Sequence, residues 1–384
     1  MAFNKIYNMK SNLLFFIIIA FASCSSLPKS IVITNPTSFD RKDEIVEVKN
    51  REILKYFSIN SSYVLKNEDN SEVPYQIITD ENKNVEALIF QANVKANQKV
   101  VYNFIKGKPS PVKAKTHARF VPERKDDFAW ENDLAAYRMY GPALANENPS
   151  NGVDLWLKRT DELIVDTFYY NELKKGLSYH VDHGKGLDCY KVGHTLGAGG
   201  IAPYLNDSLW IDGHFNSYKL HFSGPLRSKF TLTYDFVKVN DSFFREDITI
   251  TIDACSMLNR ADVTYYGDQQ NIQLAAGIFL HNNTGNLLLN ADKGIAGYCE
   301  DAISDAHLPS GRNYVGVYVP YKIKEAKVQN LHALLIADYT VGNNFTYYFG
   351  GGWNKWGYPT DNDWFNALNQ FREKISYPLI VNIK

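Results

Sequence analysis

The sequence predicts a mainly β protein with two sandwich-like parts and few helices, and three observations support this fold class. Short runs rich in β-branched and aromatic residues alternate with polar residues along most of the chain. Tyr, Phe and Trp make up 14% of the residues, an enrichment that favours strands. Helical periodicity is rare. We therefore expect a small N-terminal β-sandwich followed by a large antiparallel β-sandwich domain of the supersandwich type.

Residues 1–24 predict an export signal rather than part of the fold. A short apolar run follows two lysines and ends at Ala22-Ser23-Cys24, and it is too short for a spanning helix. Cys24 is placed as in a bacterial lipobox, where the cysteine is lipidated; a plain cleaved signal is the alternative. We expect an exported lipoprotein of the periplasm, the outer membrane or the cell surface, tethered by its lipid alone. Cys24→Ser should release it from the membrane fraction.

Residues 28–110 are predicted to form the small sandwich. Its strands are expected in β-branched runs separated by Asn, Asp and Lys turns, at Ser30 to Asn35, Ser71 to Ile78, Val85 to Val94 and Val100 to Ile105. The segment Lys108-Pro109-Ser110-Pro111 then interrupts every regular pattern. A domain boundary is predicted there.

Residues 116–384 are predicted to form the large sandwich. Apolar residues alternate with Thr and Asp from Phe230 to Phe236 and from Ile248 to Asp253. The polar stretch Val239-Asn240-Asp241-Ser242 lies between the two runs and indicates a turn. This pattern predicts an antiparallel pair of strands with one buried face and one solvated face.

One helix is predicted near the end of the chain. Apolar residues from Trp364 to Ile375 recur on one helical face, Asp361 can cap the start, and Pro378 ends the pattern. A final strand is expected from Leu379 to Ile383.

Composition argues against several classes of function. The net charge is -1, so there is no basic footprint for nucleic acid. Removal of the signal leaves three cysteines, an odd number too sparse for a disulfide framework. The chain lacks the G-x-S-x-G, H-E-x-x-H and dinucleotide-binding motifs, which argues against serine hydrolysis and hydride transfer.

The segment 179–200 has the composition of a reactive site. It holds three of the nine histidines, and its candidate residues are Tyr179, His180, Asp182, His183, Asp188, Tyr190, Lys191 and His194. Histidine titrates near neutral pH and can take and return a proton, while a nearby carboxylate orients its ring. Two other uses stay open: a divalent metal held by His180, Asp182, His183 and Asp188, and histidines of an exposed loop.

Two further segments carry residues suited to an anionic sugar. Arg138 can hold a carboxylate in a bidentate manner, and the aromatic residues beside it can support a sugar ring. Arg138 as the partner of a structural acid, Glu131 or Asp133, is the alternative. In the glycine-rich segment 350–357, Trp353 and Trp356 can stack on sugars with Lys355 on an anion, or can pack in a tight turn.

These motifs together resemble one bacterial family. Trp130 to Asp133, Ala136 to Pro142, YHVDHGKGLDCYKVGH, Ser223 to Arg227 and Gly352-Trp353 are similar to motifs of secreted "domain of unknown function" proteins encoded beside polysaccharide lyases. The resemblance covers nearly all of the mature chain. One branch, the oligosaccharide dehydratase of ulvan breakdown, removes water from a uronic acid at the non-reducing end and leaves a 4,5-unsaturated sugar. The resemblance implies this β-elimination on an anionic oligosaccharide.

The implied chemistry assigns expected roles to the candidate residues. Arg138 is expected to neutralise the uronate carboxylate. His180 or His183 would take the C5 proton, and Tyr179, Tyr190 or the second histidine would protonate the departing hydroxyl. The expected substrate contacts are Trp130, Tyr137, Tyr140, Lys191, His194, Trp353 and Lys355.

Two alternative functions remain at this level. One is a glycoside hydrolase with Glu131 and Asp133 as paired carboxylates, or a polysaccharide lyase. The other is a carbohydrate-binding lipoprotein without activity, in which the histidines are incidental. The three functions predict different outcomes with an oligosaccharide: the dehydratase removes one water, the hydrolase or lyase cuts the chain, and the binding protein binds it without turnover.

Overall fold

The structure of the chain is a computed structural model that describes residues 30–384 except 58–61, 146–151, 212, 282 and 305–306. The predicted export signal and its lipidation site, Cys24, lie outside the described residues. Within the described part, no helix combines the length and apolar character needed to cross a membrane.

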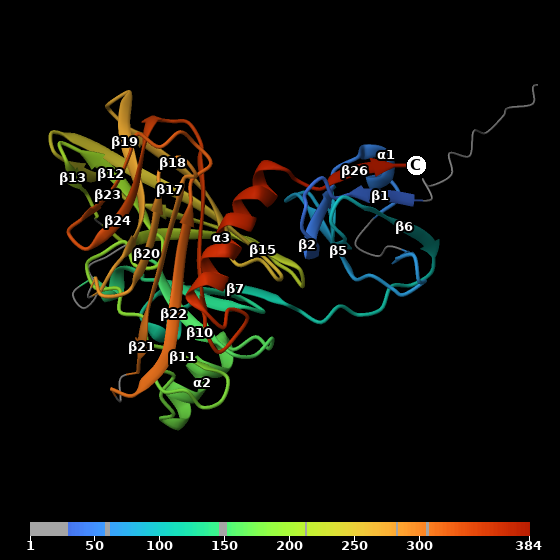
Figure 1. Cartoon of the computed structure of the whole chain (residues 1–384), viewed down its shortest axis with the longest axis horizontal. Coiled ribbons are helices and arrows are strands. Elements are labelled where there is room, and N and C mark those ends of the chain that lie inside the picture. The colour runs from blue at the N-terminus through green and yellow to red at the C-terminus, as the bar shows by residue number, and fades with distance from the viewer. Residues whose placement is uncertain (1–29, 58–61, 146–151, 212, 282, 305–306) are drawn as a thin grey trace, which may run out of the picture.

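A small β-sandwich contains the first strands of the chain (Figure 1). Its four-stranded sheet has the order β26 (Ile380–Ile383), β1 (Ser30–Thr34), β6 (Lys99–Lys106) and β3 (Tyr63–Lys66). Its three-stranded sheet has the order β2 (Arg41–Val48), β5 (Val85–Val94) and β4 (Tyr75–Thr79), and a short helix α1 (Arg51–Leu54) follows β2. One apolar cluster fills the space between the sheets, with Leu65, Leu88 and Phe90 completely buried.

The C-terminal strand β26 belongs to this small sandwich. It pairs antiparallel with β1, with Val32 opposite Asn382. The strand itself agrees with the sequence prediction, but the predicted division at residue 110 had placed it with the large part. The chain therefore leaves the small sandwich after β6 and returns to it at the end, which ties the two parts together twice.

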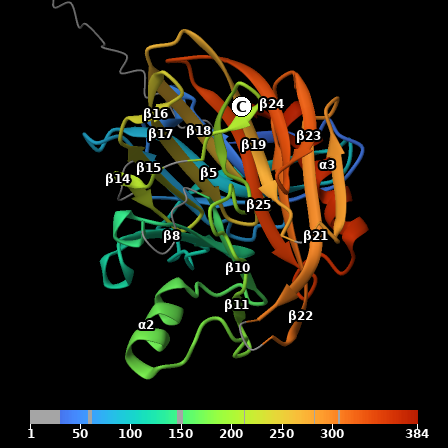
Figure 2. The same cartoon turned by 90° about the vertical axis from the view of Figure 1, so that its left-hand side faces the viewer.

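The large part contains three antiparallel sheets (Figure 1, Figure 2). The largest has the order β14 (Phe215–Ser223), β15 (Arg227–Tyr234), β17 (Ser242–Asp253), β18 (Asn259–Gly267), β25 (Phe345–Trp353), β22 (Pro309–Tyr318), β21 (Ile295–Ile303) and β20 (Asn286–Asn290), with β16 (Val237–Val239) paired to β17. A second has the order β13 (Ser208–Leu209), β12 (Ile201–Leu205), β19 (Asn271–Phe279), β24 (His332–Thr340) and β23 (Glu325–Gln329). The third has the order β11 (Gly186–Asp188), β10 (Asp154–Lys158), β9 (Ala135–Met139), β8 (Asp127–Asn132) and β7 (Thr116–Val121).

The predicted strand pair in the large part is confirmed. β15 and β17 are antiparallel neighbours with Phe230 opposite Ile250, and the short strand β16, which lies between them in the sequence, pairs with β17. Apolar residues of both strands face the core, while Thr231 and Thr249 face outward and share a hydrogen bond of 2.7 Å. The fold class is confirmed as mainly β with several antiparallel sheets.

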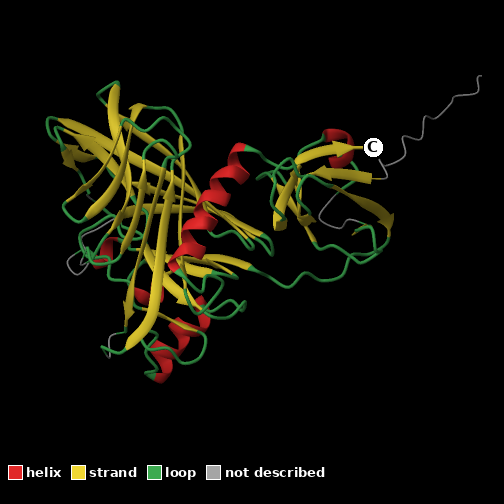
Figure 3. Cartoon of the chain, in the orientation of Figure 1, coloured by secondary structure: helices red, strands yellow, loops and turns green. Residues whose placement is uncertain are grey.

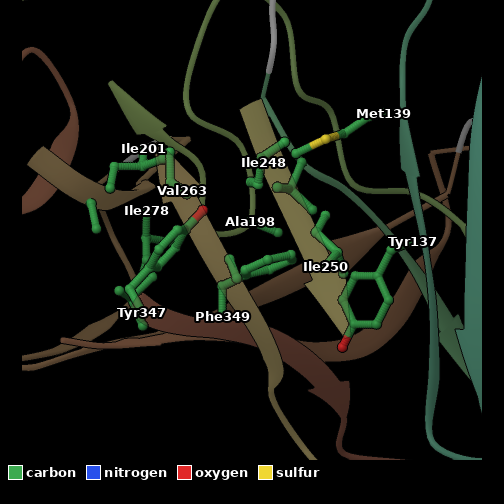
Figure 4. Packing of buried hydrophobic residues seen from close by; sticks show 14 of the residues in the cluster. Tyr137, Met139, Ala198, Ile201, Ile248, Ile250, Val263, Ile278, Tyr347 and Phe349 are labelled. Atoms are coloured by element: carbon green, nitrogen blue, oxygen red, sulfur yellow. The ribbon is translucent and has the colours of Figure 1, made fainter. Parts of the chain in front are cut away.

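One large apolar core joins the three sheets. Figure 4 shows Tyr137 and Phe349 within it, beside Ile248 and Ile250 of β17. Tyr137 contributes its hydroxyl as the acceptor for the backbone N–H of Gly351, at 3.1 Å. Burying one such large side chain contributes about 1.5–3 kcal/mol to folding. Most of the many aromatic residues are therefore buried in this core, and few of their rings are exposed.

Two longer helices cover sheet faces (Figure 3). The predicted C-terminal helix is α3 (Asp361–Ser376), and it packs on β21 and β22, where Gly297 and Gly316 leave room for Leu368. Its N-cap is Thr360 and not Asp361, because Thr360 accepts from the backbone of Asp363 in a capping box. The other helix, α2 (Val165–Lys175), covers the third sheet on the face opposite the large core. Two 3-10 turns, Pro122–Arg124 and Pro142–Leu144, flank strands of that sheet.

Candidate functional site

The candidate site lies on the third sheet, on the face covered by α2 (Figure 2). Arg138 on β9 is opposite Asp154 on β10, and its Nη2 lies 2.7 Å from Asp154 Oδ2 and 3.0 Å from Asp188 Oδ2 on β11. Its Nη1 lies 3.6 Å from Asp127 Oδ2 on β8. Four neighbouring strands thus bring three carboxylates around one guanidinium. We call Arg138, Asp127, Asp154 and Asp188 the Arg138 cluster.

The Arg138 cluster contains three acidic side chains and one basic side chain, all buried. Arg138 is 4% exposed and Asp154 is fully buried. Burial raises the pKa of Asp127 to about 7, although Arg138 and Arg124 act in the opposite direction. Among the described residues, Oδ1 of Asp127 and Nε of Arg138 have no hydrogen-bond partner. A proton on Asp127 therefore relieves part of the excess negative charge near neutral pH.

Aromatic side chains enclose the guanidinium. The Arg138 carbon Cζ lies 5.0 Å from the ring centre of Tyr140, 5.3 Å from Trp156 and 5.9 Å from Tyr179. The Tyr179 hydroxyl accepts from Arg138 Nη1 at 3.3 Å and from Arg124 Nε at 3.4 Å. Two positively charged groups therefore donate to one phenol oxygen.

His180 lies at the exposed edge of the cluster. Its Nδ1 is 3.0 Å from the backbone oxygen of Asp188 and 3.6 Å from the Asp188 carboxylate. The His180 side chain is 31% exposed, and its ring centre lies 4.6 Å from that of Tyr179. Tyr179, His180, Asp188, Arg138 and Tyr140 thus come together, as the sequence motifs predicted for one site. Of these five residues His180 is the partly exposed one, whereas Tyr179, at 3%, is as buried as Arg138.

The expected direct clamp by Arg138 does not agree with this geometry. The guanidinium is enclosed by Asp127, Asp154 and Asp188 and has almost no exposed surface. Its contacts hold Tyr179 and Asp188 in place. Arg124, which is partly exposed and contacts the same phenol oxygen, is the cation that a ligand reaches more easily.

A second polar group lies beside the cluster, and the sequence motifs did not include it. His281 Nδ1 lies 2.5 Å from Glu300 Oε1, and Asn313 Nδ2 donates to the same oxygen at 3.3 Å. The Tyr190 ring packs on His281 at 4.7 Å. The pKa of Tyr190 is well above its usual range because of burial and because of both Glu300 and Asp154. Tyr190 therefore lies between the two groups.

Several predicted ligand contacts are core residues instead. Trp130 is fully buried and donates to Asn259 Oδ1 at 3.1 Å. Tyr137 is 2% exposed, and Trp353 is 1% exposed with its indole N–H on the Ser310 carbonyl at 2.7 Å. These rings have no free face for a sugar. The prediction was wrong for them because a ring that packs in a core and a ring that stacks on a sugar have the same sequence signature.

The remaining histidines of the motif separate from His180. His183 is exposed with Nε2 2.9 Å from the Ser178 carbonyl, and His194 is exposed with Nε2 2.9 Å from the Ile211 carbonyl. Asp182 forms an ion pair with Arg159 at 3.0 Å. In the described part of the chain, no three His, Cys, Asp or Glu residues are grouped as metal ligands, so the predicted metal set is not assembled.

The other two predicted substrate contacts are exposed lysines. Lys355 lies with its Nζ 4.7 Å from the Trp353 ring centre. Lys191 follows Tyr190 directly, and its carbonyl accepts from His281 Nε2 at 2.8 Å. Of the two lysines, Lys191 is therefore the one that contacts the second polar group, through its backbone carbonyl.

The predicted pair of hydrolytic carboxylates has structural partners. Glu131 is fully buried, accepts from Lys158 Nζ at 2.8 Å, and accepts the backbone N–H groups of Ile164 and Val165 at the start of α2. Asp133 accepts from the backbone N–H of Cys255 at 2.7 Å. Both acids thus stabilise the fold, and neither reaches an open site.

Comparison with known proteins assigns the family. Residues 33–381 match the family described as Domain of unknown function (DUF4861). The chain belongs to this family. A Formosa agariphila protein called "Uncharacterized protein P7" is 30% identical over 398 residues, which cover 97% of this chain and 99% of that protein. The predicted membership of a domain-of-unknown-function family is thus confirmed, whereas the link to polysaccharide lyases and the dehydratase branch stay predictions.

Two solved structures share the fold. An α-mannosidase from Enterococcus faecalis V583 matches with a TM-score of 0.52 and 8% identity over 93% of this chain and 46% of that chain. A glycosyl hydrolase family 38 protein from Enterococcus faecalis matches with a TM-score of 0.52 and 9% identity over 93% of this chain and 47% of that chain. The DUF4861 chain spans a little under half of each solved chain. At this identity the likeness concerns the fold alone.

Proposed function

We propose that this DUF4861 protein is an oligosaccharide dehydratase that removes water from a uronic acid at a non-reducing end. The observation that carries the proposal is the contact between Tyr179, which is buried against Arg138, and His180, which is partly exposed at the edge of the Arg138 cluster. Two proton-transfer groups lie there side by side, with guanidinium groups beneath one and a carboxylate behind the other. The motif resemblance supports the same chemistry.

The reaction is a β-elimination with water as the leaving group. His180 takes the proton from C5, and the electron pair of that bond forms the double bond between C4 and C5. The bond from C4 to its hydroxyl oxygen breaks, and the oxygen leaves as water with a proton from Tyr179. His180 then returns its proton to Tyr179 through solvent. The net change is the loss of one water from the sugar.

Each neighbouring contact has a role in this scheme. Asp188 lies behind Nδ1 of His180, which orients the ring and stabilises the imidazolium that forms. Arg138 and Arg124 stabilise the phenolate that remains when Tyr179 gives up its proton. Negative charge from C5 spreads into the sugar carboxylate, so a cation must face it. Arg124 is our candidate for that cation, in place of the buried Arg138.

A hydrolase is less well supported by the same geometry. Hydrolysis needs two accessible carboxyl groups on either side of a glycosidic bond. Glu131 and Asp133 are both held by backbone N–H groups in the interior. A carbohydrate-binding protein without activity remains the outcome in which sugar binds and neither mass nor absorbance changes.

The test is incubation of the purified protein with saturated uronic-acid oligosaccharides. We expect the product to lose the mass of one water and to gain the ultraviolet absorbance of the new double bond. His180→Ala should lower turnover by about 10²–10⁴-fold while the midpoint of thermal unfolding stays near that of the wild type. His183→Ala is the matched control, because His183 is exposed and contacts the Ser178 carbonyl, and it should keep the wild-type rate. Shorter oligosaccharides or unchanged substrate would contradict the proposal.

A further inference from the structure

A cleft lies at the junction of the small sandwich and the large part, and no residue of the Arg138 cluster lines it. Its volume of about 780 Å³ is in the range of about 300–1,000 Å³ that ligand sites usually have, and such sites favour domain junctions. The lining comes from β2 of the small sandwich, from α3, and from β15, β17, β18 and β25 of the large sheet. Figure 1 shows α3 between the two parts. We call this space the junction cleft.

One side of the junction cleft is a row of side chains on the outer face of the large sheet. Lys229 on β15 pairs with Thr251 on β17. Arg260 on β18 pairs with Thr251 and, on its other side, with Tyr348 on β25. Paired residues point to the same face of a sheet, and the alternate residues, such as Ile250, lie in the core. Four strands about 4.8 Å apart make a row of roughly 14 Å, which suits an elongated ligand.

Direct contacts fix the two parts to each other beside the cleft. Arg227 on β15 donates to Glu47 Oε2 on β2 at 2.7 Å and to the two oxygens of Asp253 on β17 at 2.6 and 2.9 Å. The side-chain oxygen of Gln76 on β4 accepts the backbone N–H groups of Leu226 and Arg227 at 2.8 and 2.9 Å. The junction cleft is therefore preformed, and a preformed site loses less conformational entropy when a ligand binds.

Most acidic side chains of the junction cleft already have a basic partner. Four of the six acids that line it each accept from an arginine, and these are Glu44, Glu47, Asp253 and Asp262. The other two, Asp43 and Glu86, are exposed, so water hydrates their charges. The negative charges of the cleft therefore need no ligand, and its two arginines, Arg227 and Arg260, are already engaged with acids.

Two half-buried lysines of the junction cleft lack a comparable partner. Within the described part of the chain, the Lys229 ammonium forms no hydrogen bond or ion pair. Lys374 on α3 lies 3.8 Å from Glu44 Oε2, but Arg41 already donates to that oxygen at 2.5 Å. Burial lowers the pKa of Lys374, with Arg41 acting in the same direction and Glu44 in the opposite one. A half-buried ammonium without a close anion gains electrostatic energy from an anionic ligand.

We propose that the junction cleft is a second glycan-binding site, in which Lys229 and Lys374 bind an anionic group of an oligosaccharide. The charge of the ligand follows from the two lysines, and its carbohydrate nature rests on the proposed function. Hydroxyl and amide side chains that suit sugar hydroxyls also line the cleft, at Thr251, Ser256 and Gln370. The site is separate from the reactive one, because its lining includes no residue of the Arg138 cluster.

Amide hydrogen exchange locates a bound sugar. A saturated uronic-acid oligosaccharide is added to the full chain carrying His180→Ala, so that the sugar is not consumed. We expect slower exchange in β2 and α3. Adding Lys229→Met should raise the sugar concentration that gives half of this protection by roughly tenfold or more, because a charge-assisted contact is lost. Lys238→Met is the matched control and should not change that concentration, because Lys238 is exposed on β16 of the same sheet and outside the cleft.

Urea unfolding separates a binding role of Lys229 from a structural one. Lys229→Met should keep or raise the unfolding midpoint, because it removes a half-buried charge that has no partner in the described structure. A lower midpoint, an unchanged sugar concentration for half protection, or equal protection by a neutral glucose oligomer would overturn the proposal. Protection of β2 and α3 with no turnover of any uronate by the wild type would keep the cleft and reject the dehydratase. Turnover without that protection would reject the cleft alone.

Discussion

Two groups of buried charges lie on the same face of one sheet, and they differ in whether their charges balance. Glu131 and Lys158 stand near one end of β8 and β10, and Asp127 and Asp154 of the Arg138 cluster stand near the other. In the first group, Lys158 Nζ contacts Glu131 at 2.8 Å and the Asn132 carbonyl at 2.6 Å. The backbone N–H groups of Ile164 and Val165, at the start of α2, donate to both oxygens of the Glu131 carboxylate. One acid meets one base.

The Arg138 cluster has three acids for one enclosed base. It leaves Asp127 Oδ1 and Arg138 Nε without partners in the described structure, and it raises the pKa of Asp127 to about 7. Only this group continues to a partly exposed titratable side chain, His180. A buried acid with one matching base is typical of a structural ion pair. A group with more acids than bases, next to a partly exposed histidine, is typical of a site that transfers protons. The comparison therefore supports the choice of the Arg138 cluster as our proposed site.

The largest expected loss of folding stability comes from breaking the buried pair of Glu131 and Lys158. Lys158→Met removes the base and leaves Glu131 as an uncompensated buried charge, which costs about 3–5 kcal/mol of folding stability. Urea unfolding measures this loss. The second variant Glu131→Gln/Lys158→Met removes both charges and should recover part of it. If Lys158→Met unfolds like the wild type, the pair is not the structural element that we describe.

An intermediate effect is expected in the unbalanced group, with a defined pH dependence. The pKa of Asp127 is about 7 in the folded chain and near 3.8 without the fold, so the wild type loses stability as pH rises between those values. Asp127→Asn does not titrate. It should therefore match the wild type at about pH 4 and exceed it by about 1–3 kcal/mol at about pH 8.

The control for Asp127→Asn is its behaviour in acid. Unfolding midpoints measured from about pH 4 to about pH 8 should diverge between the variant and the wild type as pH rises. A constant difference across this range would show that the substitution acts through packing and not through the carboxylate proton.

Local pattern was enough to predict much of the fold. Strand β5 has the predicted bounds. The pairing of β15 with β17 was predictable because apolar and polar residues alternate along both strands, which lie close together in the sequence. The position of β26 was not predictable, because its pairing with β1 joins residues some 350 positions apart. Short strands carry too little signal to select a distant partner.

The same limit applies to the candidate site. Tyr179, His180 and Asp188 were predictable because they lie in one short motif. His281 and Glu300 were missed because each is a single polar residue far from that motif, and the tertiary fold alone brings them together. Trp130 was misassigned because its chemistry suits both a core and a ligand. Arg124 was missed because nothing in a lone surface arginine indicates which residue it meets.

The smallest effect on stability should come from Arg124, at the open edge of the unbalanced group. Arg124 is partly exposed and donates to the Tyr179 hydroxyl at 3.4 Å, so Arg124→Gln should change stability by no more than about 0.5 kcal/mol. It should still lower kcat/KM for a uronate by roughly tenfold or more, because a charge-assisted contact to the carboxylate is lost. Arg124→Lys should restore part of the rate. Unchanged kcat/KM together with unchanged stability would leave the uronate carboxylate without its proposed cation and would weaken the assignment of this edge as the reactive one.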